Sequence, residues 1–113
     1  MTQLLHLNRL DTVPEVTRPD PARLIAGDPV HTTWNLETRE NLYAGLWHST
    51  PGARRIVYED WEYFHIHEGV SVLTDAEGVE TTLRAGDSLV IRPGFKGSWQ
   101  VVEATLKDYV ILN

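Results

Sequence analysis

The stretch EYFHIH at residues 62–67 places apolar side chains at alternate positions, and VSVLT at residues 70–74 is rich in β-branched residues. Alternation with a period of two is typical of a β-strand that buries one face. The next residues, DAEG at 75–78, have the composition of a hairpin turn with glycine in the left-handed position. Residues 80–83, ETTL, are then the predicted return strand.

The same alternation of short strands and turns extends in both directions along the chain. A turn at residues 85–87 precedes a predicted strand at 88–91, and further strands are predicted at 99–102 and 108–112. Residues 55–58 form a strand-like run before the central stretch. Short strands separated by glycines are typical of an antiparallel sandwich or barrel. The sequence therefore predicts an all-β fold, a small antiparallel β-barrel or jelly roll of about six to ten strands.

The first part of the chain differs from the rest because it is rich in proline. Pro14, Pro19, Pro21 and Pro29 fall close together, and proline interrupts regular structure. Residues 1–27 are accordingly predicted to form an N-terminal arm, and residues 28–113 the barrel domain. The arm is either a surface segment or an extended segment that pairs with a second subunit.

Composition excludes several classes of protein. The chain has 113 residues, enough for one domain, with 42% hydrophobic and 23% charged residues. Ten basic against sixteen acidic residues give a net charge of −6, which disfavours binding to nucleic acid. No apolar run is long enough to span a membrane, and the N-terminus lacks the features of a signal peptide. Without cysteine, disulfides and thiolate metal sites are excluded, and we expect a soluble cytoplasmic protein.

Three motifs together resemble the cupin superfamily. They are EYFHIHEG at residues 62–69, AGDSLVI at 85–91 and GFKGSW at 94–99. The chain is most similar to the small single-domain cupins named after the (S)-ureidoglycine aminohydrolase cupin domain. The resemblance extends over residues 28–112, and it implies a cupin-type barrel.

Cupins commonly bind a metal through a His-x-His pair, a glutamate and a further histidine. Glu62 matches the motif's glutamate, but the His-x-His positions fall on Ile56 and Tyr58, or one residue earlier, and Gly97 replaces the last histidine. A single carboxylate does not hold a transition metal, because such sites need three or four ligands. The resemblance therefore implies a cupin without a metal cofactor.

If a metal is bound, His65 and His67 are its candidate ligands. Residues two apart share one face of a strand, so both rings could approach the same ion. Strand alternation places them opposite Glu62, however, unless a β-bulge intervenes. We therefore expect both histidines to point out of the barrel.

Glu62 is the candidate catalytic residue. Burial beside Phe64 and Ile66 would suit a general acid or base that works near neutral pH. The other interpretation is structural: Glu62 accepts hydrogen bonds from Tyr58 or from tryptophan indoles and stabilises the barrel.

The candidate ligand-binding residues are mostly aromatic. They either fill the barrel core or form a stacking wall for a small molecule. Lys96 lies in a predicted loop between Gly94 and Gly97, where it either presents a cation at the rim or is simply solvated. Arg54, Arg55 and Arg92 are other candidate anion anchors. The predicted set is Trp47, Tyr58, Phe64, Lys96 and Trp99.

Three functions remain open on sequence grounds. The first is metal-independent binding of a small molecule inside the barrel. The second is an enzyme acting on a small nitrogenous or ureide-like substrate with Glu62 as general acid and base, as the family resemblance implies. The third is a structural dimerisation module.

We also expect a homodimer, since a second subunit can cover open sheet edges. We expect neither a nucleic-acid nor a membrane partner.

Overall fold

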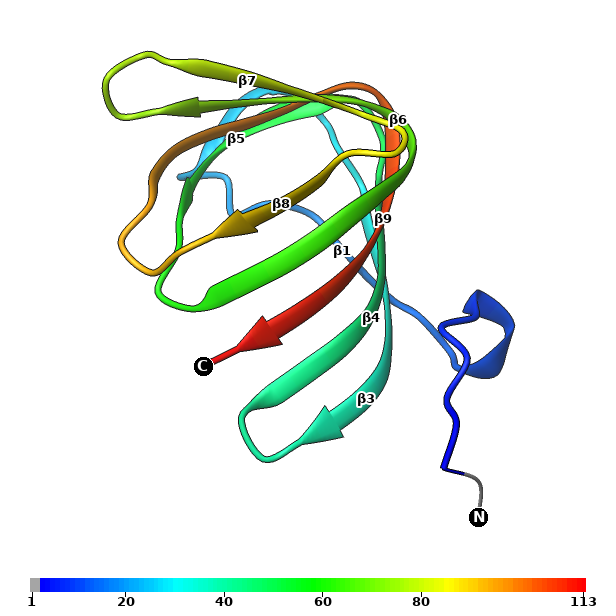
Figure 1. Cartoon of the computed structure of the whole chain (residues 1–113). Coiled ribbons are helices and arrows are strands. Elements are labelled where there is room, and N and C mark those ends of the chain that lie inside the picture. The colour runs from blue at the N-terminus through cyan, green and yellow to red at the C-terminus, as the bar shows by residue number, and fades with distance from the viewer. Residues whose placement is uncertain (1–2) are drawn as a thin grey trace.

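The computed structural model describes residues 3–113, which form one curled antiparallel sheet (Figure 1). This confirms the predicted all-β barrel-like fold. Residues 1 and 2 of the predicted arm lie outside the described residues. The elements are the 3-10 helix η1 (Arg9–Asp11) and the strands β1 (Glu15–Thr17), β2 (Leu24–Gly27), β3 (His31–Arg39), β4 (Leu42–Ser49), β5 (Gly52–Val57), β6 (Trp61–Asp75), β7 (Glu80–Arg84), β8 (Ser88–Ile91) and β9 (Lys96–Leu112).

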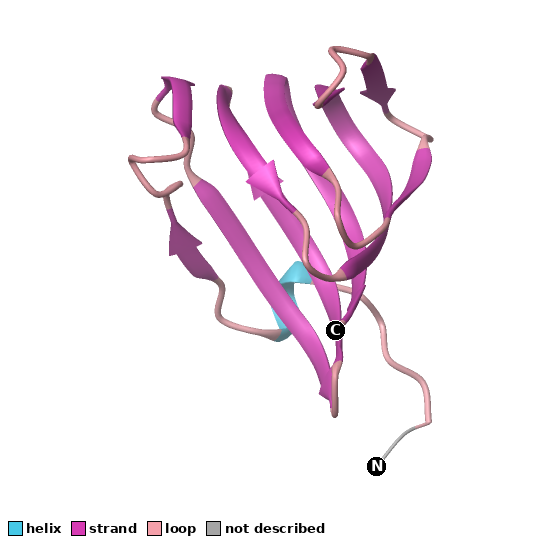
Figure 2. Cartoon of the chain, turned by 90° about the vertical axis from the view of Figure 1, so that its left-hand side faces the viewer, coloured by secondary structure: helices cyan, strands magenta, loops and turns pink. Residues whose placement is uncertain are grey.

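Two long strands, β6 and β9, hold the sheet together by pairing along most of their length. The first half of β6 also pairs with β8 and its second half with β7, while β9 pairs with β5 and then with β4. The sheet therefore curls around a shared interior (Figure 2). The sequence predicted two shorter strands in place of each long one. The difference arises because β6 continues through register shifts between Ile66 and Ser71 instead of ending.

The interior face of β6 has the alternation that the sequence predicts. Phe64 and Ile66 are fully buried, and Glu62 on the same face is only 3% exposed. Together with Trp99 of β9, Phe64 and Ile66 belong to the apolar core cluster. His65 and His67 lie on the opposite face, as expected.

The predicted arm contains two short strands that pair within the chain itself. β1 pairs with β3, and β2 pairs with β5. The prolines lie before, between and after these strands and not inside them, so each strand keeps its backbone donors. Arg9 of η1 lies over the ring of Trp34, 6.0 Å from its centroid. The domain boundary at residue 28 and the homodimer stay predictions.

Among residues 3–113 no helix is both long enough and apolar enough to cross a membrane.

Two glycines with similar backbone angles differ sharply in their surroundings. Gly78 (φ +86°) forms the predicted left-handed turn, where its N–H donates to the Asp75 carbonyl, and a Cβ there would meet nothing within 4 Å. Gly69 (φ +93°) lies where β6 crosses β9, and a Cβ there would come within 2.1 Å of the Ala104 carbonyl oxygen. An alanine would therefore face a similar strain from its φ angle at either position, but only at residue 69 would its Cβ also clash with the neighbouring backbone.

We predict that Gly78→Ala lowers the free energy of unfolding by about 1–2 kcal/mol, the cost of a left-handed alanine. Gly69→Ala should lower it by at least about 3 kcal/mol, because the backbone must also move. Urea unfolding of both variants measures the difference. Equal losses would show that the β6–β9 crossing does not require glycine.

Candidate functional site

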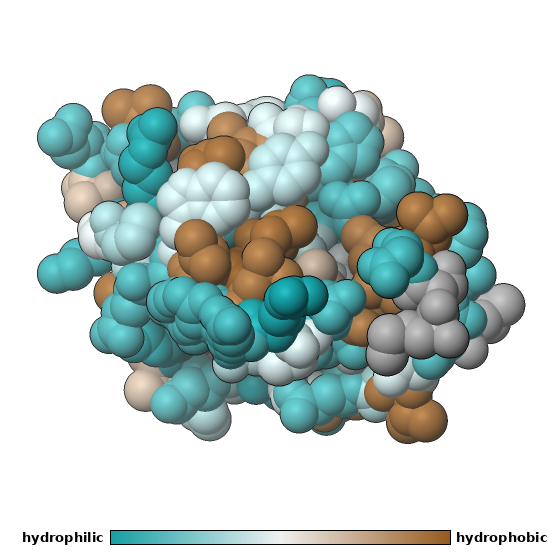
Figure 3. Space-filling model, turned by 60° about the horizontal axis from the view of Figure 1, so that its bottom comes forward, coloured by the Kyte–Doolittle hydropathy of each residue, from teal (hydrophilic) through white to brown (hydrophobic). Residues whose placement is uncertain are grey.

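A cavity of about 370 Å³ lies inside the curled sheet, and side chains from five strands and the β5–β6 connection line it. At one end of the molecule, hydrophobic side chains gather in the middle and hydrophilic ones surround them (Figure 3). The cavity combines charged, phenolic and apolar groups, which is typical of a small-molecule site. Its lining residues are Thr33, Asn35, Tyr43, Trp47, Arg54, Tyr58, Glu62, Lys107, Tyr109 and Ile111.

Glu62 has hydrogen-bond partners at both carboxylate oxygens. The Tyr58 hydroxyl donates to Oε1 at 2.7 Å, and the Lys107 ammonium donates to Oε2 at 2.9 Å. Both side chains of the Glu62–Lys107 pair are about 5% exposed or less. A buried charge must be paired in this way, because its desolvation is otherwise too costly. Tyr58 thus makes the hydrogen bond that the structural interpretation of Glu62 anticipates.

Aromatic rings surround the other side of the Lys107 ammonium. Its Nζ lies 4.5 Å from the ring centroids of Phe64 and Trp99 and 4.8 Å from that of Trp47. Such cation–π contacts stabilise a charge that has lost its water. Burial lowers the pKa of Lys107, and the charge of Glu62 opposes this shift. Of the three rings only Trp47 lines the cavity, so Phe64 and Trp99 support the site from behind.

Arg54 brings a second cation to the same cavity. Its guanidinium lies 5.3 Å from the ring centroid of Trp47 and 5.6 Å from that of Trp99. Within residues 3–113 it has no hydrogen-bond or ion-pair partner. Burial, followed by the charges of Arg54 and Lys107, lowers the pKa of His31 to about 4. The neighbouring histidine is therefore neutral at pH 7.

Tyr58 and Tyr109, two phenols of the cavity, are also neutral. Burial and then the charge of Glu62 raise the pKa of Tyr109 to about 12, and the same causes raise the pKa of Tyr58 well above its usual value. The Tyr109 hydroxyl donates to Asn35 Oδ1 at 2.9 Å. Both phenols keep their protons, so neither contributes a negative charge to the cavity.

These residues do not fit the metal that cupins commonly bind. The His-x-His positions fall on Ile56 and Tyr58 or on Arg55 and Val57, none of which is a histidine, and Ile56 is part of the apolar core. Glu62 already faces the Lys107 ammonium, and Arg54 adds a second positive charge that repels a metal cation. Across residues 3–113 no three histidine, cysteine, aspartate or glutamate side chains form a group that could hold a metal ion.

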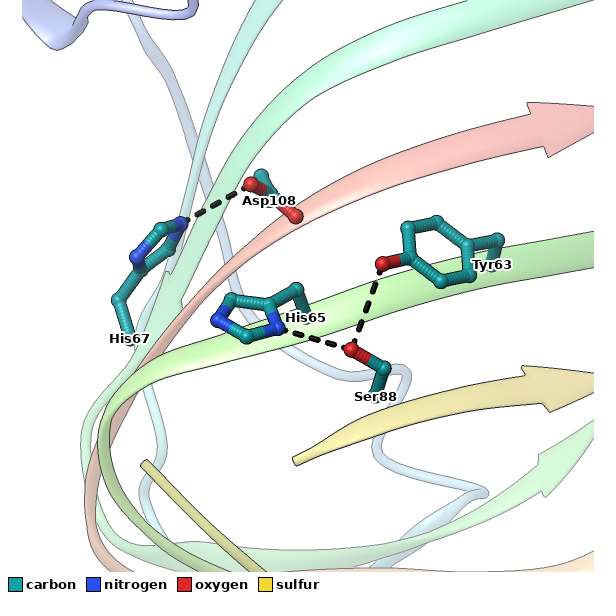
Figure 4. A network of polar contacts seen from close by, with 5 residues as sticks. All are labelled: Tyr63, His65, His67, Ser88 and Asp108. Atoms are coloured by element: carbon teal, nitrogen blue, oxygen red, sulfur yellow. Dashed lines mark hydrogen bonds and ion pairs between the residues drawn. The ribbon is translucent and has the colours of Figure 1, made fainter. Parts of the chain in front are cut away.

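His65 and His67 point away from the cavity on the outer face of β6 (Figure 4). His65 Nδ1 is 2.8 Å from the Ser88 hydroxyl, and His67 Nε2 is 3.0 Å from Asp108 Oδ2. Their ring centroids are 5.2 Å apart. Each ring is thus engaged with a different strand, and neither faces Glu62.

The structure brings Trp47, Tyr58 and Glu62 together but leaves Lys96 outside. Lys96 is the exposed first residue of β9, where it pairs with Val57, and it does not line the cavity. It begins a strand where the sequence suggested a loop, because β5 supplies a pairing partner up to that point.

Sequence reasoning did not identify several residues of the wall. They are Thr33 and Asn35 of β3, Tyr43 of β4, and Lys107, Tyr109 and Ile111 of β9. A signal for Lys107 was present: it precedes Tyr109 by two residues and Ile111 by four, so strand alternation places all three on one face. The predicted strand began only at residue 108, and so Lys107 was left out. Asn35 and Tyr43 lie in a hairpin for which no strands were predicted.

Residues 36–109 match the model of the EutQ-like cupin domain, and the chain belongs to this family of the cupin superfamily. None of the curated proteins matches the chain.

Solved structures support the same fold. A protein of unknown function from Pseudomonas syringae pv. tomato has 29% identity and a TM-score of 0.81 over 93% of this chain. The match covers only 46% of that protein, so the chain spans less than half of its length. The EutQ protein of Clostridium difficile has 18% identity and a TM-score of 0.68, over 74% of this chain and 63% of that one. A putative ethanolamine utilization protein Q from Salmonella typhimurium has 16% identity and a TM-score of 0.65, over 88% and 95%.

We predict that Lys107→Met lowers the free energy of unfolding by about 3–5 kcal/mol, because it leaves Glu62 buried without its cation. Adding Glu62→Gln should restore at least about 1 kcal/mol of that loss, since no unpaired charge then remains. Lys96→Met is the matched control on the exposed end of β9 and should change stability by less than about 0.5 kcal/mol. Denaturant unfolding measures all three variants. A loss for Lys107→Met as small as the control's would contradict the buried ion pair.

Proposed function

We propose that this cupin binds a small organic molecule in the cavity of about 370 Å³, without a metal ion. The observation that carries the proposal is the chain of contacts from Tyr58 to Glu62 to Lys107 in the cavity wall. It fixes a phenol, a carboxylate and an ammonium beside apolar surface, which is how binding sites orient a ligand. A dimerisation module without a ligand would be expected to fill its interior with side chains, so the cavity supports binding instead.

The charges of the cavity support metal independence. Lys107 neutralises the one carboxylate, and Arg54 leaves the cavity with an excess positive charge. A metal cation would have to displace the Lys107 ammonium and approach the Arg54 guanidinium, and both steps are electrostatically unfavourable.

A cavity-filling variant tests binding without disturbing the polar contacts. In a fragment screen followed by ¹⁵N NMR, we expect saturable shifts at the Trp47 indole and at the Arg54 and Tyr58 amides. Ile111→Trp fills the cavity and should abolish them. Val110→Trp, its neighbour on the other face of β9, is the control and should leave them unchanged. No saturable shift at the cavity, or equal binding to the Ile111→Trp variant, would refute the proposal.

An enzyme that acts on a small nitrogenous or ureide-like substrate is the second candidate. Lys107 favours it, because burial lowers the pKa of this amine and Glu62 links it to the Tyr58 hydroxyl. Glu62 would then take a proton from the substrate or its attacking water and return it to the leaving amine as general acid and base, while Tyr58 and Lys107 hold the carboxylate in place. The sequence resemblance to the ureidoglycine aminohydrolase cupin domain also supports this candidate.

Ammonia release from small ureides separates the two candidates. The binding proposal predicts none above the rate without protein. Release by the native chain that Glu62→Gln abolishes, while Glu80→Gln on exposed β7 does not, would establish the enzyme instead.

A further inference from the structure

The charges lining the cavity do not balance. Glu62 and Lys107 neutralise each other at 2.9 Å, and Tyr58 and Tyr109 keep their protons, so the lining has one positive charge more than it has negative charges. The one carboxylate faces two cations, and its hydrogen bonds go to Tyr58 and Lys107 and not to Arg54. A partly buried cation without a partner attracts an anion from solution.

A neighbouring hollow shares Arg54 but has a different charge balance. It has a volume of about 530 Å³ and is lined by three arginines and three acidic residues. Opposite charges can therefore offset one another there. A net excess of one positive charge is found among the residues that line the cavity of Glu62 and Lys107, and not among those that line this hollow.

Arg54 is also oriented for a particular kind of anion. Its guanidinium lies against the rings of Trp47 and Trp99. These contacts restrict the orientation of the guanidinium plane, and with it the directions of the N–H groups. A planar guanidinium donates two parallel hydrogen bonds to a carboxylate. Beyond this polar end, Tyr43, Trp47 and Ile111 provide apolar wall. The cavity thus offers a guanidinium for an anion together with apolar and aromatic surface.

We propose that the ligand is a small monocarboxylate with an apolar or aromatic body, and that its carboxylate binds Arg54. This inference rests on the proposed function, because it names the class of molecule that enters the same cavity. A single negative charge neutralises the excess charge. A neutral or cationic molecule would leave Arg54 without a counter-charge.

Three probes of nearly equal size test the charge preference: benzoate, its neutral analogue benzamide, and the cation benzylammonium. Their dissociation constants at pH 7 are measured by calorimetry, and ¹⁵N NMR of the Trp47 indole locates each binding site. We expect benzoate to bind at the cavity at least about tenfold more tightly than benzamide, as loss of one charge-assisted hydrogen-bonded pair implies. Benzylammonium should not bind there.

Arg54→Gln should abolish the preference for benzoate over benzamide. Arg54→Lys should retain part of it, since the charge stays and the two parallel hydrogen bonds are lost. Arg84→Gln removes an equal charge from an exposed position on β7 and should leave the preference unchanged. Circular dichroism establishes that each variant is folded.

The outcomes separate this inference from the proposed function. Binding of benzamide or benzylammonium at the cavity as tight as that of benzoate would overturn the monocarboxylate class and leave cavity binding intact. Unchanged benzoate affinity in Arg54→Gln would do the same. If no probe and no screened fragment shifts the cavity signals, both proposals fail.

Discussion

The buried ion pair between Glu62 and Lys107 is the constraint on which the interior of this barrel depends. Each charge would be too costly to bury alone, so each requires the other at 2.9 Å. The pair joins β6 to β9, the two strands that hold the sheet together. Because Tyr58 and the Trp47, Phe64 and Trp99 rings contact the same two groups, the pair also fixes the geometry of the cavity wall. One interaction therefore serves both stability and the candidate site.

The fold could be predicted from sequence because its signals are local. Alternation along residues 62–67 placed Phe64 and Ile66 inside and His65 outside, and the turn at residues 75–78 contains glycine where a left-handed residue is needed. The continuity of β6 and β9 could not be predicted in this way. It depends on register shifts that accommodate a bend in the strand. In the sequence of that strand alone, such a bend cannot be distinguished from the end of the strand.

The candidate site was only partly predictable, because its parts come from strands far apart in sequence. Glu62 was identified by its place in the cupin motif, and Tyr58 and Trp47 by their aromatic character. Lys107 lies 45 residues from Glu62, and its alternation with Tyr109 and Ile111 indicates a shared face but not the carboxylate that it pairs with. Its pairing appears only once β6 and β9 lie side by side. Lys96, by contrast, lies between two glycines, which suggested a loop at the rim of the site, but it is exposed and outside the cavity.

Glu62, which matches the glutamate of the cupin metal motif, is paired with Lys107 in a cavity that also contains Arg54, and we propose that this arrangement takes the place of a metal ion. The metal content of the untagged protein tests it most directly, measured by elemental analysis as purified and again after incubation with zinc or manganese and desalting. The account predicts far less than one ion per chain in both samples, because Lys107 and Arg54 repel cations from the one carboxylate. About one tightly held ion per chain in either sample would contradict it.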